Sequence, residues 1–293
     1  MDMERQNSLW GDAWQRLKKN RLAMVCLGLV VLFTALAIYG EVVFHYHDLK
    51  DITPAYQKVD LDAAYQPPGS NHWMGTDGLG RDVMARLVQG VRIAYKVGII
   101  TSLIAIPIGV FLGCLAGYFG GRVDDFIVWF YSTVASMPGL LFILAIAMVV
   151  GKGLMGIYLG IGLTTWVGIC RLVRGEVIKH KEQTYVQAAK ALGLGSGRII
   201  ARHILPNIMH VIIVTFTLRF PAAVGTEVFM SFLGIGVQGE PSWGLMINSA
   251  RMRLWQGMWW EMTFVTLAVF LLVLAFNLLG DALRDALDPR LND

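Results

Sequence analysis

Charge is scarce in this sequence. Of its 293 residues, 16% are Asp, Glu, Lys or Arg and 55% are hydrophobic, and the mean hydropathy is +0.55. Soluble domains carry roughly 25% charged residues, so an ordinary soluble globular domain is excluded. The net charge is only +4. Its basic residues stand between apolar runs, as they do on the cytoplasmic loops of membrane proteins, so no nucleic-acid partner is expected.

Motifs that carry chemistry are scarce too. The three cysteines, Cys26, Cys114 and Cys170, lie inside apolar runs without CxxC spacing, which argues against a disulfide framework and predicts small buried residues. The six histidines are scattered, and no HExxH occurs. No GxxxxGK[ST] occurs either, because the glycine-rich run at 193–197 lacks the Lys. The sequence therefore predicts no catalytic residue, no metal site and no cofactor on this chain.

Apolar runs of about 20 residues are what the chain has instead. Runs of this length are typical of membrane-spanning helices, because strands of a barrel would alternate apolar and polar residues over about 10 positions. We expect an all-α integral membrane protein with six spans, at about 22–44, 93–118, 126–150, 156–172, 208–237 and 262–279. Pro107, Pro138 and Pro221 each lie inside a span and predict kinks, with a break at Pro221.

Lys and Arg residues indicate the orientation. With the N-terminus in the cytoplasm, the cytoplasmic segments hold about twice as many basic residues as the outer ones. Residues 1–21 form a cytoplasmic amphipathic segment, which is either a helix lying in the interface or a plain positive anchor for the first span. Residues 45–92 are the outer loop, in which Asp77, Arg81 and Asp82 are expected to pair locally, and residues 281–293 are a cytoplasmic tail.

A basic loop at 173–207 separates the fourth and fifth spans. It predicts two short helices, at about 174–192 and 198–203, with a tight turn at Gly193 and with Ser196 available as a cap. The first helix would bury four side chains against the membrane face: Tyr185, Ala188, Ala189 and Leu192. From the residues alone, a docking element for a soluble partner and an ordinary amphipathic linker both stay open.

The spacing in this loop resembles a known motif. Gln187-Ala-Ala is followed after three residues by Gly193, and after nine more by His203-Ile-Leu-Pro206. This is similar to the EAA loop of ABC-importer permeases, which usually has Glu-Ala-Ala, then three residues, Gly, nine more residues and Ile-x-Leu-Pro. In this chain Gln187 stands in place of the Glu and His203 in place of the Ile. The resemblance implies a coupling helix that docks on an ATPase through Tyr185, Gln187, Ala188, Ala189, Gly193, His203, Leu205 and Pro206.

Further segments resemble the oligopeptide and dipeptide branch of these importers. They are His72-Trp-Met-Gly-Thr-Asp-Gly-Leu-Gly-Arg-Asp-Val, Ala116-Gly-Tyr-Phe-Gly-Gly-Arg-Val-Asp124, Ser231-Phe-Leu-Gly-Ile-Gly236 and the stretch 276–290. The match is to the second, C-type permease and covers nearly the whole chain. It implies the type I ABC-importer transmembrane fold, with an N-terminal helix at 22–44 and a five-helix core at 93–280.

The resemblance also implies the assembly around this chain. A second, homologous permease would complete the translocation path in the bacterial cytoplasmic (inner) membrane. Two ABC ATPase subunits would bind ATP and Mg²⁺, because this chain lacks a P-loop. An extracytoplasmic peptide-binding protein would deliver the peptide.

Two charged residues lie within the fifth predicted span. A charge there costs about 2.5–3.5 kcal/mol on insertion scales and usually faces a cavity or a partner. Arg219 and Glu227 are eight residues apart, roughly 12 Å along a helix, so direct pairing is not expected. Both are candidates for lining the peptide path. A structural bond, to the partner permease or to backbone freed at Pro221, is the alternative, and it is favoured for Glu227.

Other functions fit the sequence less well. The branch also serves nickel and other small solutes. A secondary transporter would need internal repeats and coupling-ion residues, a membrane enzyme would need a catalytic cluster, and a passive channel would leave the basic loop without a purpose.

Overall fold

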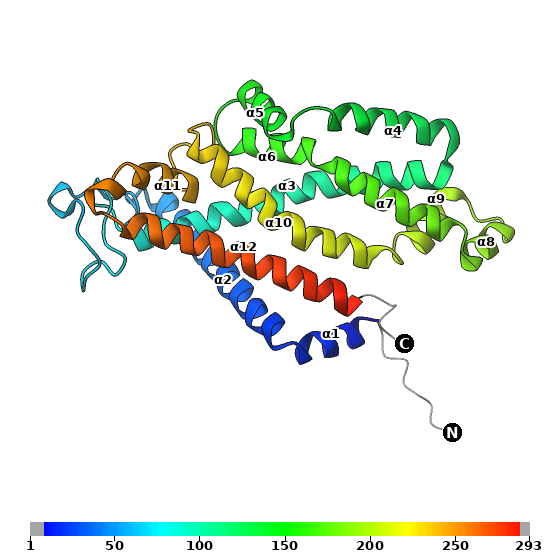
Figure 1. Ribbon diagram of the computed structural model, residues 1–293, viewed down its shortest axis with the longest axis horizontal. Coiled ribbons are helices and arrows are strands. Elements are labelled where there is room, and N and C mark those ends of the chain that lie inside the picture. Colours follow the sequence, from blue (N-terminus) through cyan, green and yellow to red (C-terminus); the bar gives the residue numbers. More distant parts are fainter. Residues whose placement is uncertain (1–8, 288–293) are drawn as a thin grey trace.

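The computed structural model describes residues 9–287, which fold into an elongated bundle of helices (Figure 1). The α-helices are α1 (Leu9–Lys19), α2 (Arg21–Lys50), α3 (Val83–Phe119), α4 (Gly121–Ala135), α5 (Gly139–Val150), α6 (Leu154–Thr164), α7 (Trp166–Lys181), α8 (Thr184–Ala191), α9 (Ser196–Ile199), α10 (Met209–Phe232), α11 (Trp243–Arg251) and α12 (Trp260–Leu287). Short 3₁₀ turns at Leu61–Ala63 and Leu254–Gln256, and a π-helical turn at Ile200–Ile204, complete the described elements.

Five spans are long and apolar enough to cross a membrane, and a sixth is obtained when the bent pair α4 and α5 counts as one. The spans run longer than predicted: α2 continues to Lys50, α3 begins at Val83, and α12 covers 260–287. The loop between α2 and α3 is therefore residues 51–82 rather than 45–92. Residues 1–8 and 288–293 of the two predicted terminal segments lie outside the described residues.

The third predicted span is not one straight helix. Between α4 and α5 the chain bends by 85° at residues 136–138. Pro138, with φ −59° and ψ 116°, is the residue just before α5. It has no N–H to continue the ladder of α4, and its ring disfavours helical backbone at Met137. The kink predicted at Pro138 is at the correct position. The bend is far sharper than a kink within a continuous helix allows.

The fifth span shows the opposite error. The predicted break at Pro221 is wrong, because α10 continues through this residue, which is buried on a helix that packs against α3, α11 and α12. The helix also ends at Phe232, five residues earlier than predicted, where Leu233 caps it and Gly234 adopts φ +77°. Packing on three neighbours outweighs the one backbone hydrogen bond that a proline removes.

The helix of the fourth span is interrupted at one residue, and nothing in its sequence predicts this interruption. α6 ends at Thr164 and α7 begins at Trp166, and together they span Leu154–Lys181. Thr165 is the single residue between them, with φ −95° and ψ 1°. The hydroxyls of Thr164 and Thr165 both bond back to carbonyls of α6, which competes with regular helix geometry and favours a bend.

The bundle is built around α3, which packs most extensively against α7. Three glycines of α3, four residues apart, face branched residues of α7: Gly109 with Ile169, Gly113 with Val173, and Gly117 with Val177. A Cβ on any of these glycines would lie 2.6–2.9 Å from the branched Cβ opposite. Missing side chains thus let the two backbones approach closely, as in small-residue interfaces of membrane helices.

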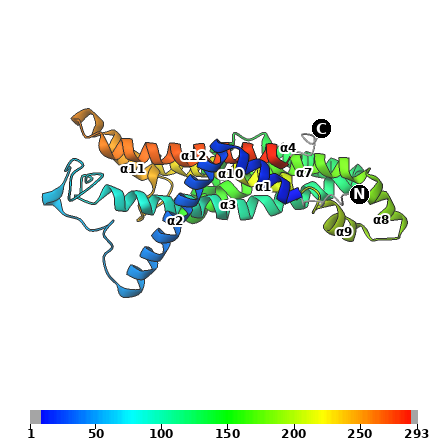
Figure 2. The same cartoon turned by 90° about the horizontal axis from the view of Figure 1, so that it is seen from below.

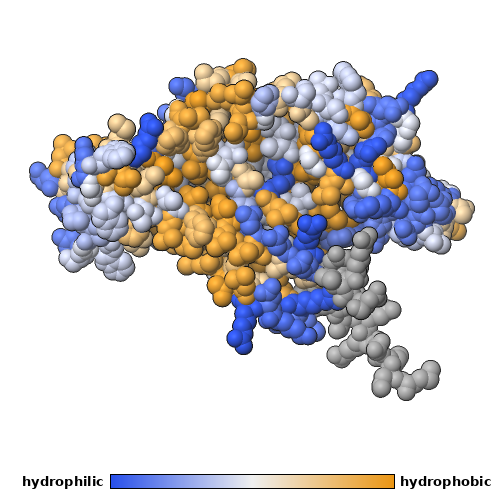
Figure 3. Space-filling view, viewed as in Figure 1, coloured by the Kyte–Doolittle hydropathy of each residue, from blue (hydrophilic) through white to orange (hydrophobic). Residues whose placement is uncertain are grey.

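Two polar ends flank the apolar middle of the molecule. The α2–α3 loop and the start of α12 lie at one end, and α8 and α9 lie at the other (Figures 1 and 2). Figure 3 shows hydrophobic surface between these two more hydrophilic ends. The predicted core positions of the three cysteines are confirmed, since Cys26, Cys114 and Cys170 are all buried.

The N-terminal segment does contain a helix. α1 packs along α12, and its Leu17 is buried in a cluster with Ala275 and Leu279 of α12 and Cys26 of α2. Asn20 separates α1 from α2 and caps α2, because its side chain accepts a hydrogen bond from the Ala23 backbone N–H at 3.1 Å. Residues 9–19 are therefore folded against the bundle.

Candidate functional site: the loop between α7 and α10

The candidate site is the α7–α10 loop, residues 182–208, at one end of the bundle (Figure 1). The span helix α7 extends to Lys181, and Gln183 then adopts extended backbone before α8 begins at Thr184. The predicted first helix at 174–192 is thus wrong as one element. It is the end of a span followed by a separate eight-residue helix.

A glycine ends α8 in the predicted place. Gly193 has φ +77°, its N–H bonds to the Lys190 carbonyl at 2.9 Å, and the Leu194 N–H bonds to the Ala189 carbonyl at 3.2 Å. These two bonds form a Schellman motif, which favours glycine at its left-handed position. The tight turn predicted at Gly193 is confirmed.

The second short helix differs in detail from the prediction. α9 begins at Ser196, two residues early, and passes into the π-helical turn 200–204, in which the Leu205 N–H bonds to the Ile200 carbonyl at 2.8 Å. Ser196 does not cap this helix. Gly195 occupies the N-cap position without a side-chain bond.

Apolar residues hold the loop to the bundle. Its fully buried side chains join the core around α3 and α7 and are Val186, Ala189, Ile199, Ile204 and Ile208. The predicted burial is confirmed for Ala189. Tyr185 is half-buried, and its hydroxyl lies 2.7 Å from Nδ1 of His180; burial raises the pKa of this phenol.

The remaining two predictions of burial are wrong. Ala188 is exposed and Leu192 is 82% exposed. The cause is the break at 182–183, which resets the rotation of α8 relative to a helix continuing from α7. The exposed surface of the loop therefore carries Leu192 beside small residues, and the polar side chains of Gln187, Arg198 and Arg202 are exposed as well. Beside it, a Cβ added to Gly195 or Gly197 would have no neighbour within 4 Å.

Gln187 contributes to the shape of this loop. Its Nε2 donates a hydrogen bond to the Lys181 carbonyl at 3.2 Å, at the end of α7. A carboxylate cannot donate, so the amide makes here a bond that a Glu could not make when ionised. His203 and Leu205 are half-buried, Pro206 is exposed, and the Asn207 amide donates to the His203 carbonyl at 2.6 Å.

The two charged residues of α10 bind different partners. Arg219 donates from Nη1 to the Thr165 carbonyl at 2.6 Å and from Nη2 to the Thr165 hydroxyl, while its Nε is buried without a partner. Glu227 is 1% exposed and accepts from Ser231 Oγ at 2.7 Å. The same Ser231 oxygen accepts a hydrogen bond from the Val237 N–H. Through Ser231, Glu227 therefore fixes the segment that follows the end of α10.

Sequence reasoning missed an ionic cluster where α2, α3 and the α10–α11 loop meet. Arg92, 2% exposed, pairs with Glu240 and lies 3.6 Å from Glu41, which also pairs with Lys96 at 2.8 Å. The Arg92 guanidinium lies 3.9 Å from the Phe44 ring centroid. The sequence did offer a signal for this cluster, because Glu41 and Lys96 are charged residues at the edges of two apolar runs.

Together these features define a polytopic membrane subunit with a folded loop at one end of its helix bundle. The family model of binding-protein-dependent transport system inner membrane components matches residues 109–293, and that of the N-terminal TM domain of oligopeptide transport permease C matches residues 8–68. The chain belongs to this family of transport permeases, in the oligopeptide and dipeptide branch.

Relatives match along nearly the whole chain. A dipeptide transport system permease of Bacillus subtilis is 41% identical over 96% of this chain and 85% of its own length. An oligopeptide transport system permease of the same organism is 38% identical, covering 97% and 90%. A glutathione transport system permease of Pectobacterium atrosepticum is 36% identical, covering 96% and 91%.

The fold has a solved counterpart. A chain of the MetNI methionine ABC transporter, in an inward-facing conformation, superposes with a TM-score of 0.55 at 18% identity. The match covers 70% of this chain and 97% of the other. The all-α ABC-permease fold expected from the sequence is therefore confirmed.

Proposed function

We propose that this chain is one of two membrane subunits of an ATP-driven peptide importer in the bacterial cytoplasmic membrane. A second, homologous permease completes the path, two ATPase subunits bind ATP and Mg²⁺, and an extracytoplasmic binding protein delivers the peptide. Both termini and the α7–α10 loop face the cytoplasm. Similarity to dipeptide, oligopeptide and glutathione permeases along nearly the whole chain supports a peptide as the substrate.

The observation that carries the proposal is the exposed face of the α7–α10 loop. The loop is anchored by buried side chains such as Val186 and Ile204, while Ala188, Leu192 and Gly193 are exposed. A helix with one face packed on the bundle and small residues on its exposed face can enter a groove of a partner closely. In a chain without a P-loop, an ATPase is the partner that this docking surface requires.

Peptide contact is proposed for the surface of α10. Arg219 is partly exposed although it lies in a span, and a guanidinium at that depth is stabilised by water or by a carboxylate more than by lipid. Glu227 is proposed to shape the path indirectly, because it is fully enclosed and its bond to Ser231 holds the end of α10.

Reconstitution tests this function. Liposomes containing both permeases and both ATPases, supplied with binding protein and labelled peptide, should import peptide when ATP is present. The same liposomes without the ATPases should import none, and this chain alone should hydrolyse no ATP above background. ATP-dependent import by the single chain would refute the proposal, as would import of a metal or sugar but no peptide by the complete system.

A further inference from the structure

A single residue joins α1 to α2. Asn20 stands between Lys19, the last residue of α1, and Arg21, the first residue of α2. Its backbone N–H donates to the Leu17 carbonyl at 3.1 Å, and its side chain accepts from the Ala23 N–H at 3.1 Å. A joint this short, bonded to both helices, fixes the angle between them. We call residues 14–25, which contain this joint, the elbow.

Burial holds the elbow against the rest of the bundle. Leu17 is buried in a cluster with Cys26 of α2 and with Ala275 and Leu279 of α12. Side chains of three helices meet there, so moving α1 away would uncover apolar surface. The elbow therefore presents its exposed side chains in a fixed arrangement.

The exposed side of the elbow is basic. Residues 14–21 hold no acidic residue and four basic ones, namely Arg16, Lys18, Lys19 and Arg21. Lys18, Lys19 and Arg21 are exposed. Among the side chains that the structure describes, no carboxylate forms an ion pair with any of these three. Four basic residues directly beside a span are typical of segments that bind anionic lipid.

These charges lie at the edge of the hydrocarbon. The 19 residues 22–40 of α2 contain no charged residue, and as a helix they measure roughly 28 Å, close to the hydrocarbon thickness of about 30 Å. Arg21 therefore stands at the level of the headgroups, with Lys18 and Lys19 just outside it. Trp14 is exposed one turn further, and the Lys18 ammonium lies 5.1 Å from its ring centroid. An exposed Trp beside a cation is typical of this interfacial level.

Apolar surface continues from the charges along α2. Leu22 is 57% exposed and Val25 is 61% exposed, whereas the opposite side of α2 packs on α3 and α12. Figure 3 shows hydrophilic surface over α1 directly beside the hydrophobic surface of α2. A ligand that fits both surfaces has an anionic head and a long apolar tail.

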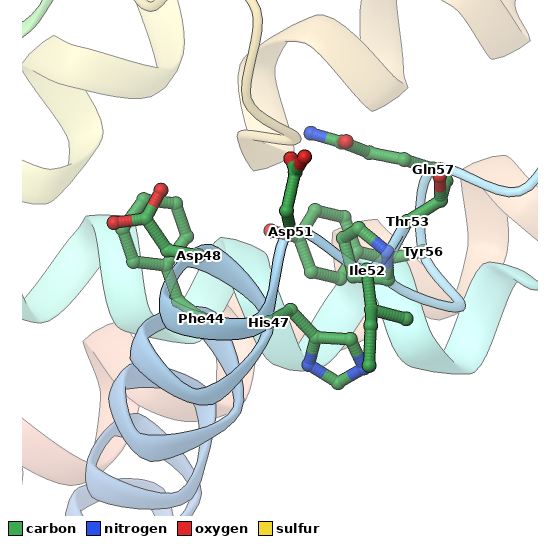
Figure 4. A pocket seen from close by; sticks show the side chains of 9 residues that line it. Phe44, His47, Asp48, Asp51, Ile52, Thr53, Tyr56 and Gln57 are labelled. Carbon is green, nitrogen blue, oxygen red and sulfur yellow. The ribbon is translucent and has the colours of Figure 1, made fainter.

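The other end of α2 carries charge of the opposite sign. A pocket of about 270 Å³ opens there, and the described residues that line it include Asp48 and Asp51 but no Lys or Arg (Figure 4). Lys50, in the last turn of α2, donates instead to the Tyr46 hydroxyl at 2.8 Å. The two carboxylates would repel an anionic head. The charge of α2 and its flanks therefore selects such a head at the elbow alone.

We propose that the elbow is a binding site for an anionic phospholipid, whose head lies against Lys18, Lys19 and Arg21 and whose acyl chains lie along Leu22 and Val25. Ammonium and guanidinium groups donate charge-assisted hydrogen bonds to a phosphate. An anchor that only set the orientation of α2 would need positive charge, but neither a folded joint nor an apolar wall beside it. The inference goes beyond the proposed function, because it requires only that the chain spans a membrane.

The test is photolabelling of the complete importer, purified in an uncharged detergent, with phosphatidylglycerol that carries a photoreactive acyl chain. Peptide mapping should place the label on the elbow, and phosphatidylcholine with the same acyl chain should label it far more weakly. Lys19→Gln and Arg21→Gln should each raise the half-saturating concentration about fivefold, the usual effect of one basic residue at an anionic membrane surface. Arg21→Lys keeps the charge and should retain most of the affinity.

Lys50→Gln is the matched control, because it removes the same charge from the other end of the same helix and should leave labelling unchanged. The unfolding midpoint of each variant without phospholipid must match wild type, so that lost labelling reports binding rather than folding. Both lysine-to-glutamine variants are exposed surface changes, which makes this comparison practicable.

Three results would overturn the proposal. The first is equal labelling of the elbow by phosphatidylglycerol and phosphatidylcholine. The second is displacement of the lipid by glycerol phosphate at equal concentration, which would make the site one for free phosphate. The third is a photo-crosslinking residue in place of Leu22 that captures another protein subunit instead of lipid. An importer that binds the lipid as expected but imports no peptide would overturn the proposed function and leave the elbow site standing.

Discussion

Arg219 of α10 donates two hydrogen bonds to Thr165, the single residue that separates α6 from α7. Thr165 is the N-cap residue of α7, so its carbonyl accepts the first hydrogen bond of that helix, and the guanidinium adds a charged donor to the same oxygen. The same arginine therefore joins α10, which carries the proposed peptide surface, to the one-residue interruption in the span that leads to α8.

Arg219→Ala should slow peptide import, because the Thr165 carbonyl loses a charged donor worth about 1.5–3 kcal/mol. Arg219→Lys should retain part of the activity, since an ammonium keeps the charge but lacks the planar fork. Transport rate and unfolding midpoint are the measurements, with Thr215→Ala on the same helix as the control. The proposed contact with peptide requires that Arg219→Cys react with a water-soluble thiol reagent in some transport state. If it stays unreactive in every state and Arg219→Ala imports normally, the contact with peptide is wrong.

Gly193→Asp should abolish ATPase association while leaving the protein in the membrane. The residue has φ +77° and closes the Schellman motif at the end of α8, where a side chain strains the backbone, and its charge enters the exposed face. Co-purification of the ATPases measures the effect. Gly197→Ala, in open space with ordinary backbone, is the matched control. Normal ATPase recovery with Gly193→Asp would contradict docking through this loop.

Gly113→Ala should destabilise the bundle by about 1–3 kcal/mol, the usual penalty for overpacking. Its Cβ would lie 2.8 Å from the Cys170 carbonyl and 2.9 Å from the Val173 Cβ. Gly175→Ala on α7 faces open space and should be neutral or slightly stabilising, since Ala is the better helix former. Thermal unfolding in detergent compares the two, and equal midpoints would mean that α3 and α7 are not closely packed.

Acid should loosen the α2–α3 loop, residues 51–82, through Asp77. Burial alone would raise the pKa of this carboxyl, but hydrogen bonds from the Arg81 side chain and from the Leu79 and Arg81 N–H groups lower it below its usual value. A lowered folded-state pKa contributes stability that is present above the unfolded-state pKa, about 3.9, and is lost as pH falls through the folded-state value. The protection of residues 59–82 against hydrogen exchange, measured relative to the unfolded chain at the same pH, should therefore fall at the acid end of this window. Asp77→Asn should exchange faster at neutral pH and respond less to acid.

The sequence predicted the class of fold and the place of the candidate site, because long apolar runs and a motif of fixed spacing are local signals. It did not predict the 85° bend before Pro138 or the continuity of α10 through Pro221. A proline removes the same hydrogen bond in both places, and only the surrounding packing decides whether the helix continues.

The side chains at the site were harder to place. Gly193 follows from its turn chemistry, which is local. The exposure of Leu192 depends on a break at 182–183 that rotates α8, and such a break leaves no periodic signal. An arginine in a span predicts that a partner exists, yet Thr165 as that partner depends on how α6, α7 and α10 pack.

The glycine contacts along α3 have a mechanical consequence. α3 is 37 residues long, roughly 55 Å, and reaches from the α2–α3 loop to the end of the molecule that carries α8. Because the branched side chains of α7 pack directly on the glycine backbone of α3, the two helices should move together as a single lever. Turning such a lever by about one degree about one end displaces the other end by about 1 Å, so a small rearrangement at one surface is felt as a sizeable shift at the other.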